Sequence, residues 1–214
     1  MKNVLILAAN GQIAQIVEKR ILKEQPDVKL TLFLRDKDRL ADLANNSQVT
    51  LVEGDLNNPA DVDSAMKGQD IAVVAVVDHA ADSKITHNVI DAAKKNGVQR
   101  VVQTNIGGIY DEFSGEFARW AKEMMGDGFK TAWRAADLLE NSGLDYTILR
   151  LPWLNDRDIH YVIGHKGEPF VGVSGSRASV ADVIVKIIAD PSFASRDSIS
   201  IGDPDTDGET RPVY

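Results

Sequence analysis

The chain has 214 residues, 43% of them hydrophobic, and a formal net charge of −8 at pH 7. This length suits one well-packed domain, and the acidic balance without a run of lysines or arginines argues against nucleic acid or an anionic membrane surface as partner. The sequence has no cysteine, which excludes disulfides and thiolate metal sites and is compatible with the cytoplasmic location that we expect. No apolar stretch approaches the length of a membrane span.

A change of hydrophobic period near the N-terminus predicts the first strand and the first helix. Residues 4–8 (VLILA) form a continuous apolar run, typical of a strand buried on both faces. From Ile13 onward the apolar residues recur on one face of a helix, and Glu18 and Lys19 are expected on the polar face. Residues 9–12 then form a tight strand-to-helix turn, whose free N–H groups and helix dipole favour an anion.

The spacing of small residues indicates which anion this turn binds. A nucleotide-binding turn needs small residues at the bend, beside the pyrophosphate and where the helix packs on the strand. Ala8, Gly11 and Ala14 hold these positions, in the spacing G-x-x-G-x-x-G. Because only one of the three is glycine, an ordinary turn without a ligand explains this segment equally well.

Strand-like and helix-like segments alternate along the following chain. Strands are predicted at residues 28–34, 48–53, 71–77, 98–103 and 145–151, and helices at residues 37–44, 59–66, 82–96 and about 130–141. This alternation predicts an α/β fold, a Rossmann-type doubly wound parallel sheet with helices on both faces. In such a sheet, ligands bind beyond the carboxyl ends of the strands.

Charged residues follow two of these strands. Arg35 comes after the second strand, where the adenosine ribose of a dinucleotide lies, and its guanidinium can clamp a 2′-phosphate with Lys37 nearby. The alternative is that Arg35 only caps a surface turn next to Asp36. Asp55 comes after the third strand, where an adenine edge lies, although it could equally cap the next helix.

Several segments together resemble one known family. They are LILAANGQIA at residues 5–14, Arg35, Gly54-Asp55-Leu56, the helix end at 88–98, SGLDYTILRLPWL at 142–154 and SRASVADVI at 176–184. In this order they look like the atypical short-chain dehydrogenases/reductases, most of all the small NmrA-like and NAD(P)H-flavin or biliverdin reductase B-like members. The resemblance covers residues 1 to about 189. It implies a single NAD(P)-binding Rossmann domain over residues 1–214, with a dinucleotide-binding core at 1–151 and a small substrate-side region at 152–214.

The resemblance also implies a cofactor site, in which Arg35 favours NADP(H) over NAD(H). The implied contacts are the 2′-phosphate with Arg35, the adenine with Asp55 and Leu56, the adenosine ribose with Val76 and Val77, the pyrophosphate with Asn10, Gly11, Gln12 and Ile13, and the nicotinamide with Pro152, Trp153 and Leu154.

The turn departs from the family pattern at Ala8, where members usually have glycine. If the backbone there needs a positive φ, alanine costs about 1 to 2 kcal/mol.

The catalytic residues depart further. Members that reduce carbonyls use a serine and then Tyr-x-x-x-Lys, in which the tyrosine is the proton donor. The resemblance places Phe129 and Trp133 at those two positions, and neither side chain can donate a useful proton. The serine position falls on Thr104 or Asn105, which could still donate a hydrogen bond to the nicotinamide amide or to the substrate. Tyr110 is the nearest remaining phenol, although such a tyrosine often only packs with its hydroxyl in water.

Two functions agree with these observations. One is an NADPH-dependent oxidoreductase, a monomer or homodimer, that passes hydride to a planar acceptor such as a flavin or quinone. The other is a non-catalytic NADP(H)-binding redox sensor of the NmrA type.

An amphipathic segment at residues 113–125 could close over the substrate or serve as an ordinary packed face. The four histidines lack the close pairing of zinc ligands, so we predict no metal site.

Overall fold

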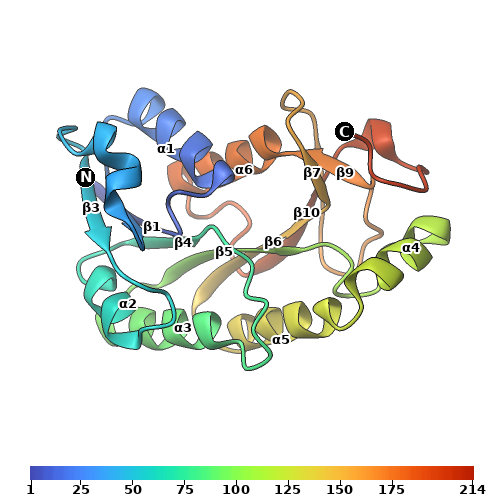
Figure 1. The fold of residues 1–214 in the computed structure, drawn as a ribbon, viewed down its shortest axis with the longest axis horizontal. Helices are drawn as coiled ribbons and strands as arrows, with labels where there is room; N and C mark the ends of the chain where they lie inside the picture. Colours follow the sequence, from blue (N-terminus) through green and yellow to red (C-terminus); the bar gives the residue numbers. More distant parts are fainter.

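The computed structural model describes residues 1–214 and contains an eight-stranded sheet with the order β3-β2-β1-β4-β5-β6-β10-β8 (Figure 1). All neighbouring strands of this sheet pair in parallel except β8, which runs antiparallel to β10. The strands are β1 (Lys2–Leu7), β2 (Val28–Leu34), β3 (Val49–Glu53), β4 (Ile71–Val74), β5 (Arg100–Ile106), β6 (Asp145–Leu151), β8 (Val162–Gly164) and β10 (Asp197–Gly202). The predicted α/β fold of Rossmann type is confirmed.

Helices cover both faces of the sheet. Figure 1 shows α1 (Gln12–Glu24) and α6 (Arg177–Ala189) on one face, and α2 (Pro59–Met66), α3 (Lys84–Asn96) and α5 (Gly128–Glu140) on the other. Side chains of β1 alternate between the two layers: Val4 and Ile6 join the core beneath α1 and α6, while Leu5 and Leu7 join the core on the opposite face. This burial on both faces explains the continuous apolar run.

Several strand and helix boundaries, and the type of one helix, differ from the sequence prediction. β4 ends at Val74 rather than at residue 77, because β1 ends at Leu7 and the last pairing contact is the bond from the Ala75 N–H to the Leu7 carbonyl, 3.0 Å. β5 instead continues to Ile106, since β6 accompanies it on the other side. The segment predicted as a helix at residues 37–44 is a 3₁₀ helix, η1 (Lys37–Leu43).

One predicted polar position was wrong. Glu18 is 1% exposed, although its spacing places it opposite the apolar face of α1. α6 packs along this second side of α1, where Arg20 bonds Asp182 at 2.7 Å and Gln25 bonds the Val185 carbonyl at 3.1 Å. α6 therefore buries part of α1 that lies outside its apolar face.

Residues 152–214 are divided between two places. α6 and β10 complete the main core, while β7 (Trp153–Asn155) and β9 (Ser174–Ser176) form a separate two-stranded sheet beside α4 (Gly115–Met125) (Figure 1). A short 3₁₀ helix, η2 (Pro204–Thr206), follows β10. None of the helices is both long and apolar enough to cross a membrane.

Candidate functional site

A pocket of about 750 Å³ opens at the carboxyl ends of β1, β2, β3 and β4. Seven predicted cofactor residues line it: Ala8, Asn10, Gly11, Arg35, Asp55, Leu56 and Val76. Eight others also line it, namely Phe33, Leu34, Asp36, Arg39, Gly54, Asn57, Ala75 and Ile85. The pocket lies at the edge of the sheet where a Rossmann-type fold binds its ligand.

The turn between β1 and α1 forms one wall of the pocket. Ala8 has φ of +62°, the left-handed conformation that costs alanine about 1 to 2 kcal/mol. Its carbonyl accepts the N–H of Gly11 at 3.0 Å. A Cβ on Gly11 would lie 3.3 Å from this carbonyl oxygen and 3.6 Å from that of Ala75, so glycine lets the chain pass close to both. Gly11 begins α1 without a side-chain cap, and the first turn contains no acidic residue, which leaves N–H groups for an anion.

Two arginines follow β2: Arg35 at the tip of the strand and Arg39 within η1. Arg35 and Arg39 are both exposed, line the pocket, and form no ion pair or side-chain hydrogen bond within the chain. Asp36 lies between them, but its carboxylate accepts the N–H of Asp38 at 3.2 Å and begins η1. The alternative in which Arg35 caps this turn is therefore wrong. Arg39 was not predicted from the sequence, and Lys37, which was, lies outside the pocket lining.

The opposite wall follows β3. A Cβ on Gly54 would lie 2.5 Å from the ring of Phe33, so the ring packs directly on the glycine backbone. Asp55 accepts hydrogen bonds from the Asn57 N–H at 2.9 Å and from the Asn57 amide at 3.1 Å, and these bonds lower the pKa of the Asp55 carboxyl. Asn58, not Asp55, caps α2 by accepting the N–H of Ala60. Asp55 is therefore free of the capping role.

The pocket does not reach all of the predicted cofactor residues: it leaves out two predicted for the pyrophosphate, one predicted for the adenosine ribose, and those predicted for the nicotinamide. Gln12, Ile13, Val77, Thr104 and the segment 152–154 all lie outside its lining. The Thr104 hydroxyl donates to the Val74 carbonyl at 3.1 Å, and the side chain is buried inside the sheet.

Asn105 and Tyr110 are both held by other parts of the chain. The Asn105 amide donates to the Ala132 carbonyl at 3.0 Å, and its oxygen accepts the N–H of Ile106. The Tyr110 hydroxyl donates to Glu140 at 2.5 Å, and burial together with this bond raises the pKa of Tyr110 well above its usual range. In this conformation neither side chain offers a free proton to the pocket.

Aromatic side chains gather above β5 and β6. We call Phe113, Phe117, Trp120, Trp153 and Phe170 the aromatic cluster; its neighbouring rings have centroids 4.7 to 5.6 Å apart. Phe117 is 4% exposed, so residues 113–125 include a packed face.

Glycines after β5 admit these rings. A Cβ on Gly107 would lie 2.6 Å from Phe170, and one on Gly108 would lie 2.6 Å from Phe129. Phe129 therefore packs against the loop backbone, and Trp133 is 45% exposed.

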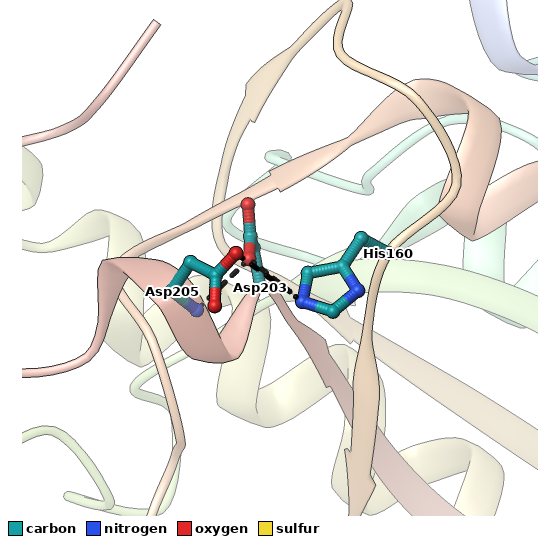
Figure 2. A group of neighbouring side chains, drawn as sticks. All are labelled: His160, Asp203 and Asp205. Atoms are coloured by element: carbon teal, nitrogen blue, oxygen red, sulfur yellow. Dashed lines mark hydrogen bonds and ion pairs between the residues drawn. The ribbon is translucent and has the colours of Figure 1, made fainter.

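A separate group of metal-ligating side chains lies in the C-terminal part of the chain. Figure 2 shows His160, Asp203 and Asp205 turned toward one another, with their ligand atoms within 4.8 Å. The sequence predicts no metal site because its histidines lack the close pairing of zinc ligands, whereas this group joins His160 with residues more than forty positions away.

Comparisons with known proteins agree with this geometry. The sequence model of a family described as NAD(P)H-binding matches residues 8–191. A short-chain dehydrogenase/reductase from Veillonella parvula DSM 2008, solved in complex with NADP, is 27% identical with a TM-score of 0.91, over 100% of this chain and 99% of that chain. A Rossmann-fold NAD(P)-binding family protein from Shigella flexneri is 35% identical with a TM-score of 0.82, again over 100% and 99%.

A more distant solved structure is similar to this chain in fold only. ChuY, an anaerobillin reductase from Escherichia coli O157:H7, is 23% identical with a TM-score of 0.79, over 99% of this chain and 100% of that chain. A comparison with curated proteins found no match. The family match covers most of the chain, and the pocket lies where this fold binds its ligand. The chain therefore belongs to the NAD(P)H-binding family, an oxidoreductase family of the atypical short-chain dehydrogenase/reductase type.

Proposed function

We propose that this chain is an NADPH-dependent oxidoreductase that passes hydride to a planar acceptor such as a flavin or quinone. The main support for the proposal is that two features occur together at the carboxyl edge of the sheet. They are a pocket with two unpaired arginines and an aromatic cluster that lacks a free proton donor.

The pocket residues fit a dinucleotide with a 2′-phosphate. The turn at Gly11 leaves room for pyrophosphate beside the N-terminus of α1, and Leu56 provides an apolar contact for adenine. Arg35 and Arg39 would hold the 2′-phosphate, because guanidinium groups bind phosphate oxygens through charge-assisted hydrogen bonds. The complex of the Veillonella relative with NADP supports this choice of cofactor.

The acceptor class follows from the residues near β5. Hydride transfer to a simple ketone builds negative charge on its oxygen, and losing the proton donor typically costs a factor of about 10² to 10⁴. Phe129 and Trp133 stand where the resemblance places that donor and its lysine. Bound nicotinamide supplies the hydride, and a flavin or quinone spreads the incoming charge over its own rings. The chain then needs only to orient the acceptor, exclude water and hold the two rings at reacting distance.

One observation favours a second candidate, a non-catalytic NADP(H) sensor of the NmrA type. The pocket ends before Thr104 and before residues 152–154, and the rings of Trp120 and Trp153 pack on each other with centroids 4.7 Å apart. A cofactor-binding protein whose acceptor side stays filled by its own rings would bind NADPH without turning it over.

Steady-state oxidation of NADPH, followed at 340 nm, separates the candidates. We expect turnover with FMN, FAD or menadione and little with benzaldehyde or acetone, and Phe129→Leu should leave the rate with flavin nearly unchanged. Rapid reduction of an aliphatic ketone would show that another proton donor operates. Tight NADPH binding without turnover of any acceptor would favour the sensor.

A further inference from the structure

His160, Asp203 and Asp205 come from two segments that the fold brings together. His160 lies between β7 and β8, while Asp203 and Asp205 follow β10 at the start of η2. Two hydrogen bonds hold these segments: the Ser179 hydroxyl accepts the His160 N–H at 3.1 Å, and the Asp203 N–H donates to the Ser174 carbonyl at 2.9 Å. The group is therefore held by the fold and lies apart from the cofactor pocket.

The distances suit one small cation. His160 Nε2 lies 3.4 Å from Asp205 Oδ2 and 3.9 Å from Asp203 Oδ1. Ligand atoms arranged tetrahedrally about Zn²⁺ at about 2.0 to 2.1 Å lie roughly 3.4 Å from one another. The side chains of His160 and Asp205 are 55% and 78% exposed, so both can shift by a fraction of an ångström without disturbing the core. In Figure 2 the imidazole and the two carboxylates face a common point.

The charge of Asp203 is a second, independent observation. Its side chain is only 8% exposed, and its single ion-pair contact is with His160 at 3.9 Å. The N–H of Asp205 donates to its Oδ1 at 3.0 Å, and no lysine or arginine reaches it. Buried charges in proteins are normally paired or bound to a metal.

His165 provides the contrast. Its Nδ1 lies 2.6 Å from Asp197 Oδ2, and that bond raises the pKa of His165, as expected for a simple histidine and carboxylate ion pair. Only one carboxylate lies within ion-pair distance of its ring, whereas two do so for His160. The two histidines are both more than half exposed, which makes His165 a matched control for His160.

We propose that His160, Asp203 and Asp205 form a binding site for a divalent transition-metal cation such as Zn²⁺ or Ni²⁺. One imidazole nitrogen and two carboxylate oxygens are donors that these borderline ions accept, whereas Mg²⁺ and Ca²⁺ prefer oxygen alone. Three protein ligands leave the remaining coordination positions to water. The bound ion ties the loop before β8 to the segment after β10, so it stabilises the folded state without taking part in hydride transfer.

Calorimetric titration of the untagged, EDTA-treated full chain with ZnCl₂ and NiCl₂ tests the site. We expect one equivalent to bind in the micromolar range and to raise the melting temperature, while MgCl₂ gives no saturable signal. His160→Ala and Asp205→Asn should each weaken Zn²⁺ binding at least tenfold, and His165→Ala should bind as the unmodified protein does. Circular dichroism checks that these exposed substitutions leave the fold intact.

Three results would overturn the proposal. They are the absence of saturable binding at one equivalent, equal Zn²⁺ affinity in His160→Ala and the unmodified protein, and a loss in His165→Ala as large as that in His160→Ala. Because none of these readouts depends on NADPH turnover, they are independent of the proposed oxidoreductase function.

Discussion

Arg35 is the residue on which the choice of cofactor depends most. Arg35→Ala should weaken NADPH binding by about 1.5 to 3 kcal/mol, the range of a charge-assisted contact, and leave NADH binding nearly unchanged. Arg39→Ala should act in the same direction, because both side chains line the pocket without a partner. Calorimetry with both nucleotides measures the effect.

The neighbouring Lys37 is the control for this experiment, since it is exposed and lies outside the pocket lining. Lys37→Ala should change the affinity for NADPH only slightly. An equal loss in Lys37→Ala and Arg35→Ala would mean that the effect is general electrostatics rather than a 2′-phosphate contact.

Ala8 carries backbone strain at the bend of the cofactor turn, with φ of +62°. Ala8→Gly relieves about 1 to 2 kcal/mol of that strain, which offsets the larger entropy of the unfolded glycine chain, about 0.5 to 1 kcal/mol. We therefore expect equal or greater stability in urea unfolding, and equal or tighter NADPH binding by calorimetry. Clearly weaker binding would show that the alanine methyl group makes a useful contact with the cofactor.

Glu18 makes the stability of the chain depend on pH. Its Oε1 is buried without a partner, and burial raises the pKa of this carboxyl to about 8. In the folded chain the Glu18 carboxyl keeps its proton up to about pH 8, whereas in the unfolded chain it releases the proton at about pH 4.3. Between these values the unfolded state binds fewer protons, so the free energy of unfolding falls as pH rises. Glu18→Gln should remove this loss and be more stable at pH 8 by about 1 to 3 kcal/mol.

Urea unfolding at pH 5 and pH 8 measures the change in slope. Glu123→Gln, on the exposed side of α4, should keep the slope of the unmodified protein. If Glu18→Gln shows the same pH dependence of the free energy of unfolding as the unmodified protein, the account is wrong, and the Glu18 carboxyl is ionised in the folded chain.

At the scale of elements, a buried ion pair fixes the loop after β5. Arg150 of β6 lies 2.7 Å from Glu112, and the two side chains are 1% and 4% exposed. Glu112 also accepts the N–H groups of Gly108 and Tyr110 at 2.9 and 2.7 Å. The pair therefore holds the loop that carries Phe113 into the aromatic cluster.

Breaking this pair on one side should be costly. Arg150→Met leaves the Glu112 carboxylate buried without its cation, and we expect a loss of about 3 to 5 kcal/mol in urea unfolding. The double variant Arg150→Met/Glu112→Gln should be more stable than Arg150→Met alone, because it removes the unpaired charge. A double variant less stable than the single one would contradict this account of the pair.

An exposed ion pair provides the comparison. Lys122 and Asp111 lie 3.0 Å apart with side chains 66% and 83% exposed. Lys122→Met should change the free energy of unfolding by less than about 1 kcal/mol.

Elements with a clear hydrophobic period are predictable from this sequence, and elements set by their partners are not. β2 at Val28–Leu34, β6 at Asp145–Leu151 and α2 at Pro59–Met66 agree with the predicted bounds. No element was predicted after residue 151, yet β10 extends the sheet there beside β6. Its sequence, DSISIG, alternates serine with isoleucine, and both serines are buried. The Ser200 hydroxyl donates to the Gly164 carbonyl at 3.3 Å, while Arg150 bonds the backbone carbonyl of Ser198 at 3.0 Å.

At the scale of the whole molecule, the sequence predicts site residues at strand ends better than site residues placed by loops. Strand tips place Arg35 and Asp55 directly, since parallel strands present their carboxyl ends at one edge. Arg39 enters the pocket only through the bend of η1, and the contact between His160 and Asp203 depends on the path of the chain around β8 and β10. Tyr110 turns toward Glu140, a contact that its position in the sequence does not reveal.

The central claim is that the carboxyl edge of this sheet binds NADPH through Arg35 and Arg39, the two arginines that follow β2. Calorimetric titration of the unmodified protein with NADPH and with NADH tests it most directly. The account predicts a single site that binds NADPH at least about tenfold more tightly, since one charge-assisted contact is worth about 1.5 kcal/mol or more. Equal affinities, tighter binding of NADH, or no binding of either nucleotide would contradict it.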